Sequence, residues 1–234
     1  MSATALAVAS GITLWGLVAT GVAAGGGMLL GEHLSPSGSQ LDLRGTAVSD
    51  TDLAGLRDPA FDQVEAVLLA RTAVTSAGLA HLARLPLKSV DLYRTAVDDN
   101  GLVHLDGLKL EKLTLSGTKI TDEGLSHIAG HALAELVLRD TAVTDDGMAH
   151  LDSQPLRLLD ISRTAITERG LELLGPQPLL EFLDISDTAV GDGAIGYLAA
   201  LPRIRTINLA GTLLNTETIA RLRAERPDVR VVGV

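Results

Sequence analysis

Recurring histidines could bind a metal ion or change charge near neutral pH if the fold brought them together. Four of them lie 23 residues apart: His81, His104, His127 and His150. His131 follows His127 by four residues, which would place both on one face of a helix. However, no third ligand accompanies this pair, and the series continues as Leu173, Tyr197 and Arg221. We therefore interpret the series as one helix-surface position copied with a repeat, and predict no metal site.

The segment Gly191-Asp-Gly-Ala-Ile-Gly196 matches the GxGxxG pattern of dinucleotide-binding loops. Its glycines fall at ordinary repeat positions, and Asp192 stands where a pyrophosphate would need bare backbone N–H groups. The chain has no Walker loop, GxSxG, HExxH or calcium-loop motif, and it has no cysteine. We interpret its many carboxylates as solvated surface residues. The sequence therefore predicts a protein that is not an enzyme and has no cofactor or small-molecule substrate.

The element that positions these residues is a repeated unit, seen most clearly at residues 110–128, LEKLTLSGTKITDEGLSHI. Leu113 and Leu115 alternate as in a short strand, and Thr121 offers a helix N-cap before the apolar pair Leu125 and Ile128. Such a unit cannot bury its apolar face alone and must stack on copies of itself.

Equivalent threonines mark eight copies of the unit, 23 to 26 residues apart: Thr46, Thr72, Thr95, Thr118, Thr141, Thr164, Thr188 and Thr212. An apolar residue follows each threonine by two positions. Residues of types found at helix N-caps come next: Ser49, Thr75, Asp98, Thr121, Thr144, Thr167, Gly191 and Asn215. The agreement of these columns predicts one elongated repeat domain over residues 41–234, with the last helix at Thr216–Ala224 and a final strand at Val229–Val232.

At these residues the chain resembles the leucine-rich repeat family. LEKLTLSGT is similar to the LxxLxLxxN strand half with threonine in place of asparagine, and ITDEGLSHIAG is similar to bacterial GALA-type and F-box-type repeats. The family's asparagines bond the backbone of neighbouring turns, and a threonine hydroxyl offers a weaker version of that bond. The resemblance implies an α/β solenoid of about eight repeats: a right-handed arc with a parallel sheet on the concave face and helices on the convex face. It also implies binding of other proteins.

Strand side chains between the inward leucines are expected on the concave face, because side chains alternate along a strand. The residues predicted to bind protein there are aromatic, apolar or arginine: Leu68, Arg71, Tyr93, Arg94, Val137, Arg139, Leu158, Arg163 and Phe182. We expect the aspartates of this face to pair with arginines on neighbouring strands. A contact through the convex side or the membrane segment is the alternative.

Residues 1–31 contain no ionisable side chain, and the apolar run at residues 5–30 is long enough to cross a bilayer. We predict a single transmembrane helix there, followed by a polar linker at residues 32–40. A cleaved secretory signal is the rival interpretation, with Val22-Ala23-Ala24 as a possible cleavage site. No Lys or Arg precedes Arg44, so the positive-inside rule assigns no orientation, although we favour an extracytoplasmic array.

The net charge of −10 argues against nucleic-acid binding, which needs a basic surface. We therefore expect a membrane-anchored repeat protein that binds other proteins, as an accessory or assembly subunit of a membrane complex. The alternative is a secreted or periplasmic soluble effector or envelope factor with a cleaved signal.

Overall fold

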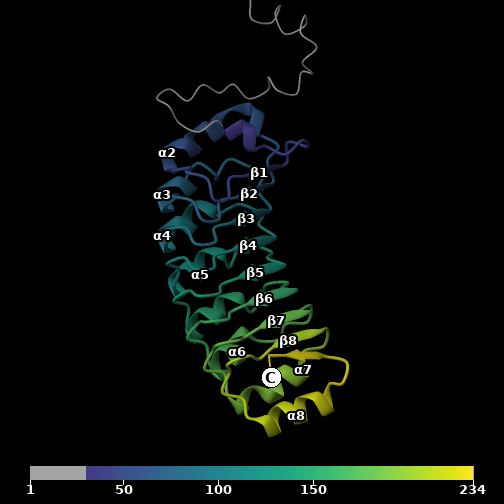
Figure 1. Ribbon diagram of the computed structural model, residues 1–234. Helices are drawn as coiled ribbons and strands as arrows, with labels where there is room; N and C mark the ends of the chain where they lie inside the picture. The colour runs from purple at the N-terminus through teal and green to yellow at the C-terminus, as the bar shows by residue number, and fades with distance from the viewer. Residues whose placement is uncertain (1–29, 234) are drawn as a thin grey trace, which may run out of the picture.

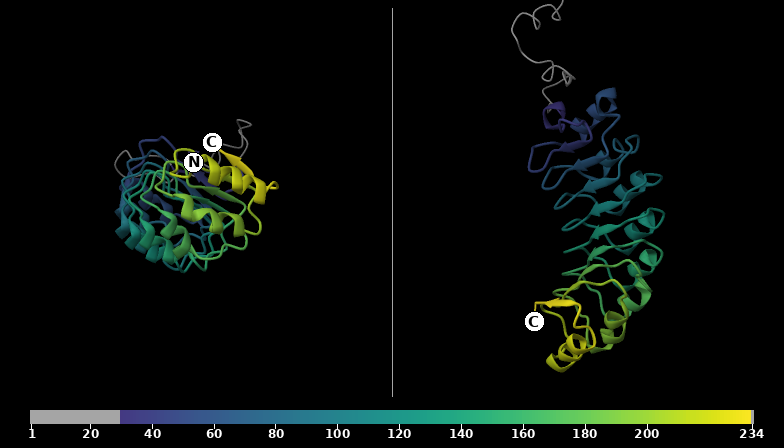
Figure 2. Two further views of the ribbon diagram at one scale, coloured as in Figure 1. Left: turned by 90° about the horizontal axis from the view of Figure 1, so that it is seen from below. Right: turned by 90° about the vertical axis from the view of Figure 1, so that its right-hand side faces the viewer.

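The chain folds into one elongated stack of repeats (Figure 1), which the computed structural model describes for residues 30–233. Each repeat contributes a three-residue strand, a turn and a short helix or helical turn. The strands line one side of the stack and the helices the other, and the stack bends with the strands on its inner, concave side (Figure 2). The predicted α/β solenoid with a parallel sheet is confirmed for these residues.

The strands form one nine-stranded parallel sheet whose order follows the sequence. They are β1 Gln40–Asp42, β2 Ala66–Leu68, β3 Ser89–Asp91, β4 Lys112–Thr114, β5 Glu135–Val137, β6 Leu158–Asp160, β7 Phe182–Asp184, β8 Thr206–Asn208 and β9 Arg230–Val232. Leu113, in the middle of β4, pairs with Val90 in β3 and Leu136 in β5. From β1 to β8 the middle residue of each strand is buried, which confirms the predicted strand phase.

The helical side is built from short α-helices and 3-10 turns. The α-helices are α2 Asp50–Leu53, α3 Ser76–Leu79, α4 Asp99–Leu102, α5 Asp122–Ile128, α6 Glu168–Leu174, α7 Ile195–Ala200 and α8 Thr216–Glu225. The 3-10 helices are η2 Leu30–His33, η3 Ala54–Arg57, η4 Pro59–Phe61, η5 Val103–Leu105, η6 Asp145–Leu151 and η7 Asp192–Ala194. The N-caps fall at the predicted column, where Thr121 accepts a hydrogen bond from the N–H of Glu123 at 3.3 Å.

The threonine column closes the turn that follows each strand. All eight hydroxyls donate to the backbone carbonyl three residues earlier, at 2.5 to 2.8 Å. Thr118, for example, donates to Leu115. The bond therefore stays within its own repeat rather than reaching the neighbouring turn as we expected, because a hydroxyl on Cβ is too short to span the nearly 5 Å between strands.

Each end of the hydrophobic core is covered by a terminal element of the chain. Leu30 of η2 is only 5% exposed, and Leu34 forms an antiparallel bridge to Leu41 in β1. Residues 32–40, which we predicted as a linker, are thus folded onto the first strand. At the other end, α8 and β9 close the stack, in agreement with the predicted C-terminal helix and strand.

Among residues 30–233, no helix is both long and apolar enough to cross a membrane. Of the predicted transmembrane segment, residues 1–31, only Leu30 and Gly31 lie in the described part of the chain, both in η2. The rest of that prediction falls outside the described residues.

Candidate binding surface

The concave face of the sheet is a regular surface on which no described helix packs (Figure 2). The first and third residues of each strand point to this face and remain partly or fully exposed, while the helices cover the other face. Fully parallel sheets are usually covered on both faces. A parallel sheet with one bare face is therefore a surface to which a partner can add the missing layer.

The turn residue directly before each threonine of the column has a left-handed backbone in all eight repeats. Glycine occupies it at Gly45, Gly117 and Gly211, and the others are Arg71, Arg94, Asp140, Arg163 and Asp187, with φ between 52° and 59°. Side chains other than glycine rarely adopt this conformation. Three of the predicted binding arginines are therefore held at strained turn positions along one edge of the concave face.

Two of the predicted apolar residues come together, and two do not. Leu158 on β6 is the register partner of Phe182 on β7, so these half-buried side chains form a small apolar patch. Leu68 pairs with Asp91, and Val137 lies between Thr114 and Asp160 in the neighbouring strands. The apolar part of the predicted site is therefore a local patch rather than a continuous stripe.

Tyr93 lies between two of the predicted arginines. The guanidinium carbons of Arg71 and Arg94 are 5.4 and 5.2 Å from the centre of the Tyr93 ring, within cation–π range. Residues from two successive repeats therefore meet at this ring. The sequence predicted that the three residues share one face, but it did not predict their contact.

Aspartates of the sheet face mostly bind their own turn. Asp160 accepts hydrogen bonds from the N–H of Ser162 at 2.9 Å and from its hydroxyl at 2.6 Å. Arg139 donates to that hydroxyl at 3.0 Å and so meets Asp160 only indirectly. Burial raises the pKa of Asp160 from its ordinary value, and the charge of Asp184 on the next strand adds to the increase.

The expected pairing of aspartates with arginines across strands is therefore wrong for most of the face. Asp184 repeats the arrangement of Asp160, with Ser186 as its donor and Asn208 bonding its second oxygen at 2.9 Å. Arg163 and Asp187, 3.2 Å apart, do pair across repeats, at the turn edge. The physical reason is local: an aspartate at the strand end reaches the N–H two residues on without ordering a long side chain.

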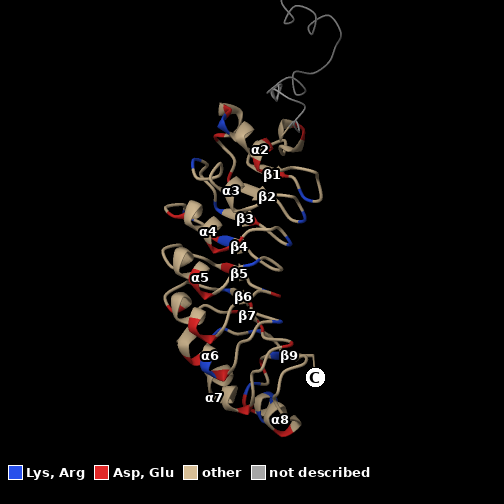
Figure 3. Cartoon of the chain, turned by 90° about the vertical axis from the view of Figure 1, so that its left-hand side faces the viewer, with Lys and Arg blue, Asp and Glu red and all other residues tan. Residues whose placement is uncertain are grey.

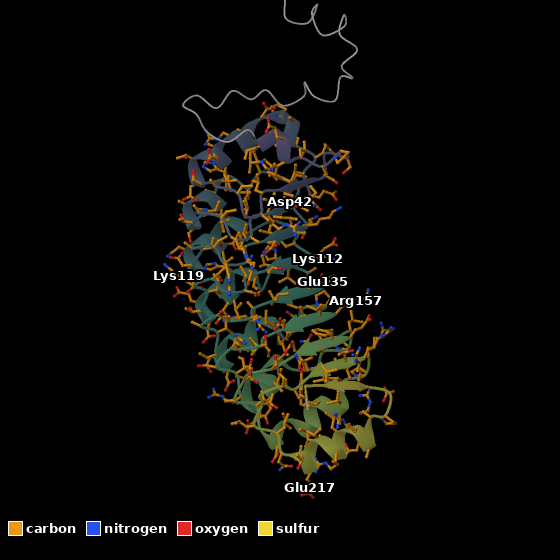
Figure 4. The ribbon with its side chains drawn as sticks, viewed as in Figure 1. Asp42, Lys112, Lys119, Glu135, Arg157 and Glu217 are labelled. Atoms are coloured by element: carbon orange, nitrogen blue, oxygen red, sulfur yellow. The ribbon has the colours of Figure 1, made fainter. Side chains whose placement is uncertain are left out.

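Charged pairs across repeats gather instead at the beginning of the strands. Lys112 and Glu135 are 2.6 Å apart, Lys88 meets Glu65 at 2.8 Å, and Arg157 meets Glu181. Lys112, Glu135 and Arg157 follow one another along the strand side (Figure 4). These pairs are largely exposed and balanced in charge, so each contributes little to stability.

A hydrogen-bonded series that sequence reasoning missed runs along the helix starts. In most repeats the residue after the N-cap is an aspartate whose carboxylate binds the N-cap residue of the next repeat. The N–H and hydroxyl of Thr121 donate to Asp99 at 2.8 and 2.6 Å. Equivalent bonds join Asp50 to Thr75, Asp122 to Thr144, Asp145 to Thr167 and Asp192 to Asn215.

This inter-repeat aspartate series corrects our interpretation of the carboxylates as solvated. Acidic residues recur along the helix side of the stack (Figure 3), and those of the series are mostly half-buried. The signal was present in the sequence: an acidic residue or serine follows the cap in every repeat but the last, with glycine two positions later in most repeats. A Cβ at Gly124 would overlap the Asp99 carboxylate, and Gly78, Gly147 and Gly170 face the same overlap. The glycines make room for the series.

The GxGxxG match is explained by these same positions. Gly191 is the N-cap, and its N–H donates to Glu168 of the preceding repeat at 3.3 Å. Ala194, not Gly193, occupies the position of the glycine column in this repeat, and a Cβ built at Gly193 would lie 3.4 Å from the Glu168 side chain, an ordinary contact distance. Of the three glycines, Gly191 thus serves a contact between repeats.

The histidine series lies on the helical side. His127 Nδ1 is 3.9 Å from a carboxylate oxygen of Asp106, and both residues line an open hollow of about 460 Å³ together with His131. His131 is buried, and its Nδ1 bonds the carbonyl of Leu108 at 2.9 Å. Among residues 30–233, no three His, Cys, Asp or Glu side chains are grouped to hold a metal.

His131 begins a buried polar column that continues at Gln154 and Gln177. Gln154 donates to the carbonyl of Ala129 at 2.8 Å and accepts from the N–H of Leu133 at 2.9 Å. Gln177 donates to the carbonyl of Leu174 at 3.0 Å. These side chains satisfy carbonyls at helix ends, which have no partner within the helix.

Comparison with known proteins supports the leucine-rich repeat family. A family model described as Leucine Rich repeat matches residues 108–129, the region where the repeated unit is clearest in the sequence. No curated protein matches the chain.

Solved structures share the fold at low sequence identity. An internalin from Listeria monocytogenes is 16% identical with a TM-score of 0.63, over 82% of this chain and 52% of the internalin chain. A chain of the mouse RP105/MD-1 complex is 16% identical with a TM-score of 0.51, over 81% of this chain and 38% of that chain. This chain thus spans about half or less of the chains it matches, and the likeness defines the fold alone: a leucine-rich repeat solenoid.

Proposed function

We propose that the chain is a non-enzymatic, membrane-anchored leucine-rich repeat protein that binds another protein with its concave face. The observation that carries the proposal is the bare face of the nine-stranded parallel sheet. It presents the Leu158–Phe182 patch and the Tyr93 ring, half-buried side chains of the kind that anchor protein interfaces. Half-buried anchors are already partly ordered and lose less conformational entropy on binding.

The comparisons supply a second line of support. The mouse structure is of a complex, RP105 with MD-1, so a solenoid of this fold occurs in a protein assembly. By analogy of fold, we assign this chain a protein partner, as an accessory or assembly subunit of a membrane complex. We propose no catalytic role.

Membrane anchoring rests on the uncharged apolar run at residues 5–30. The array begins at the end of this run, because its last residue, Leu30, packs in the core of the array. An anchor in the part of the run before Leu30 would therefore hold the first repeats close to the bilayer surface. We place the array on the extracytoplasmic side.

The direct test is purification of the full chain with a C-terminal tag from native membranes in mild detergent. Mass spectrometry then determines the N-terminus and the co-purifying chains. We expect an intact N-terminus and a partner in fixed stoichiometry. Recovery of a soluble monomer that begins near Gly25 would refute the anchor and favour a secreted or periplasmic soluble factor.

Surface variants test which face binds. Leu158→Ser combined with Phe182→Ser removes the apolar patch of the sheet and should abolish recovery of the partner. Val103→Ser removes a side chain that is 44% exposed on the helical side, and should leave recovery unchanged. The reverse pattern would assign binding to the convex face.

A further inference from the structure

The Arg71–Tyr93–Arg94 cluster carries two positive charges that no acidic side chain of residues 30–233 pairs with. Both arginines are exposed, and their closest charge-related contact is the shared Tyr93 ring, at 5.4 and 5.2 Å. Eight other arginines do form ion pairs: Arg44, Arg84, Arg157, Arg163, Arg169, Arg205, Arg221 and Arg226. Acidic residues outnumber basic ones by 29 to 19 in the chain, so internal partners were not scarce.

Asp91, the acidic residue at the end of β3, has a hydrogen-bond partner other than the two arginines. Asp91 accepts a hydrogen bond from the backbone N–H of Tyr93 at 2.9 Å and makes no ion pair with either arginine. A stacked ring attracts a guanidinium but does not neutralise it, and stacking leaves the outward N–H groups free. The cluster therefore retains donors and positive charge that face solvent.

The surrounding residues hold the cluster in place. Gly117 lies beside Arg94, and a Cβ built there would be 3.1 Å from Arg94 Cγ, so a larger residue would displace that side chain. Ala70 and Ser116, which occupy the position of Tyr93 in the flanking repeats, are small and buried, so Tyr93 is the one large side chain of these three positions. Arg71 and Arg94 adopt left-handed backbone conformations that glycine adopts in the flanking repeats.

We propose that the Arg71–Tyr93–Arg94 cluster is the docking site for an acidic segment of the protein partner, with an Asp or Glu side chain of that segment bound between the two guanidiniums. Arginine binds carboxylates through two parallel hydrogen bonds, and arginine–tyrosine clusters are typical interface anchors. At this end of the face Asp42 is paired with Arg44, which leaves the two cluster arginines against one carboxylate, Asp91, so charge complementarity favours an acidic segment here. This inference rests on the proposed function, since it names the chemistry of the partner at the same face.

The experiment measures fluorescence anisotropy of a fluorescein-labelled decaglutamate peptide titrated with the full chain in mild detergent at low salt. We expect saturable binding that weakens at least tenfold in Arg71→Ala/Arg94→Ala. The control Arg203→Ala/Arg223→Ala removes two exposed arginines for which the described part of the chain shows no cation–π contact, and should change the affinity less than twofold. Gly117→Leu, which displaces Arg94 without removing charge, should also weaken binding. Far-ultraviolet circular dichroism confirms that each variant is folded.

Three outcomes would overturn the proposal: no saturable binding by the unmodified chain, equal loss in the control variant, or binding to phosphatidylserine vesicles without binding to the peptide. Recovery of the native partner separates this inference from the proposed function. If Arg71→Ala/Arg94→Ala still recovers the partner while Leu158→Ser/Phe182→Ser does not, the face binds protein but the acidic contact is refuted.

Discussion

The contact between Asp99 and Gly124 gives a sharp test of how the repeats hold together. Asp99 accepts two hydrogen bonds from Thr121 of the next repeat, and Gly124 leaves the space in which its carboxylate lies. The two residues should therefore behave as one unit. We predict that Asp99→Ala and Gly124→Ala are each destabilising, and that their effects are strongly non-additive.

The magnitudes follow from the contacts. Asp99→Ala removes two hydrogen bonds to a half-buried carboxylate and leaves a donor unpaired, a loss of about 2–4 kcal/mol. Gly124→Ala would by itself gain about 1 kcal/mol of helix propensity, but the overlap with the carboxylate turns this into a loss of about 1–3 kcal/mol. Once Asp99 is truncated the overlap is gone, apart from a contact with Ile120 Cγ2 at 3.1 Å. The double variant should therefore be about 2–4 kcal/mol more stable than the sum of the single losses predicts.

The assay is equilibrium unfolding in urea, followed by circular dichroism, for the unmodified chain and the three variants. Gly196→Ala serves as the control, because a Cβ at this helical glycine has no neighbour within 4 Å. It should leave stability unchanged or raise it by up to about 1 kcal/mol. Additivity of Asp99→Ala and Gly124→Ala to within about 0.5 kcal/mol would refute the reasoning, since it would mean that the carboxylate does not occupy the space beside Gly124.

Three further predictions concern single positions. Leu115→Ala should cost about 2–5 kcal/mol because Leu115 is fully buried, whereas the neighbouring Thr114→Ala should change the unfolding free energy little, and equal losses would contradict the strand phase. Burial raises the pKa of Asp160 in the folded chain, so the ionised side chain, present at pH 7, is less favourable to folding than the protonated one, present at pH 3. Asp160→Asn removes this charge. The difference in melting temperature between Asp160→Asn and the unmodified chain should therefore be more positive at pH 7 than at pH 3. A hydrogen bond from Arg44 lowers the pKa of Asp42, so the matched variant Asp42→Asn should show a small effect of opposite sign, and a common sign would refute one of the two assignments. Gln154→Leu should cost about 1–3 kcal/mol by leaving a buried backbone N–H unpaired, and an unchanged melting temperature would show that this bond contributes nothing.

Local patterns decided much of the fold in advance. The alternation at Leu113 and Leu115, the cap at Thr121 and the repetition of both along the chain predicted the strand phase, the helix starts and the parallel stack. These features depend on residues close together in sequence, and a repeat places its copies side by side without further information.

The contacts that join one repeat to the next were harder to infer. The bond from Thr121 to Asp99 spans 22 residues, and the identity of its acceptor depends on how far each turn is displaced along the stack. The preference of Asp160 for Ser162 over an arginine depends on the exact direction of a side chain at the strand end. Such choices are set by backbone geometry within a few tenths of an ångström, which residue type and spacing alone do not specify.

The sequence by itself determined that this chain is a stack of about eight repeats with one apolar core, an apolar N-terminal run and a face of small, acidic, arginine and aromatic residues. Only the tertiary structure decided that Arg71 and Arg94 share the Tyr93 ring, that Leu158 meets Phe182, and that the aspartates after the caps link successive repeats. The physical reason is that periodicity determines which face a residue occupies, whereas packing between repeats determines which residues touch on it.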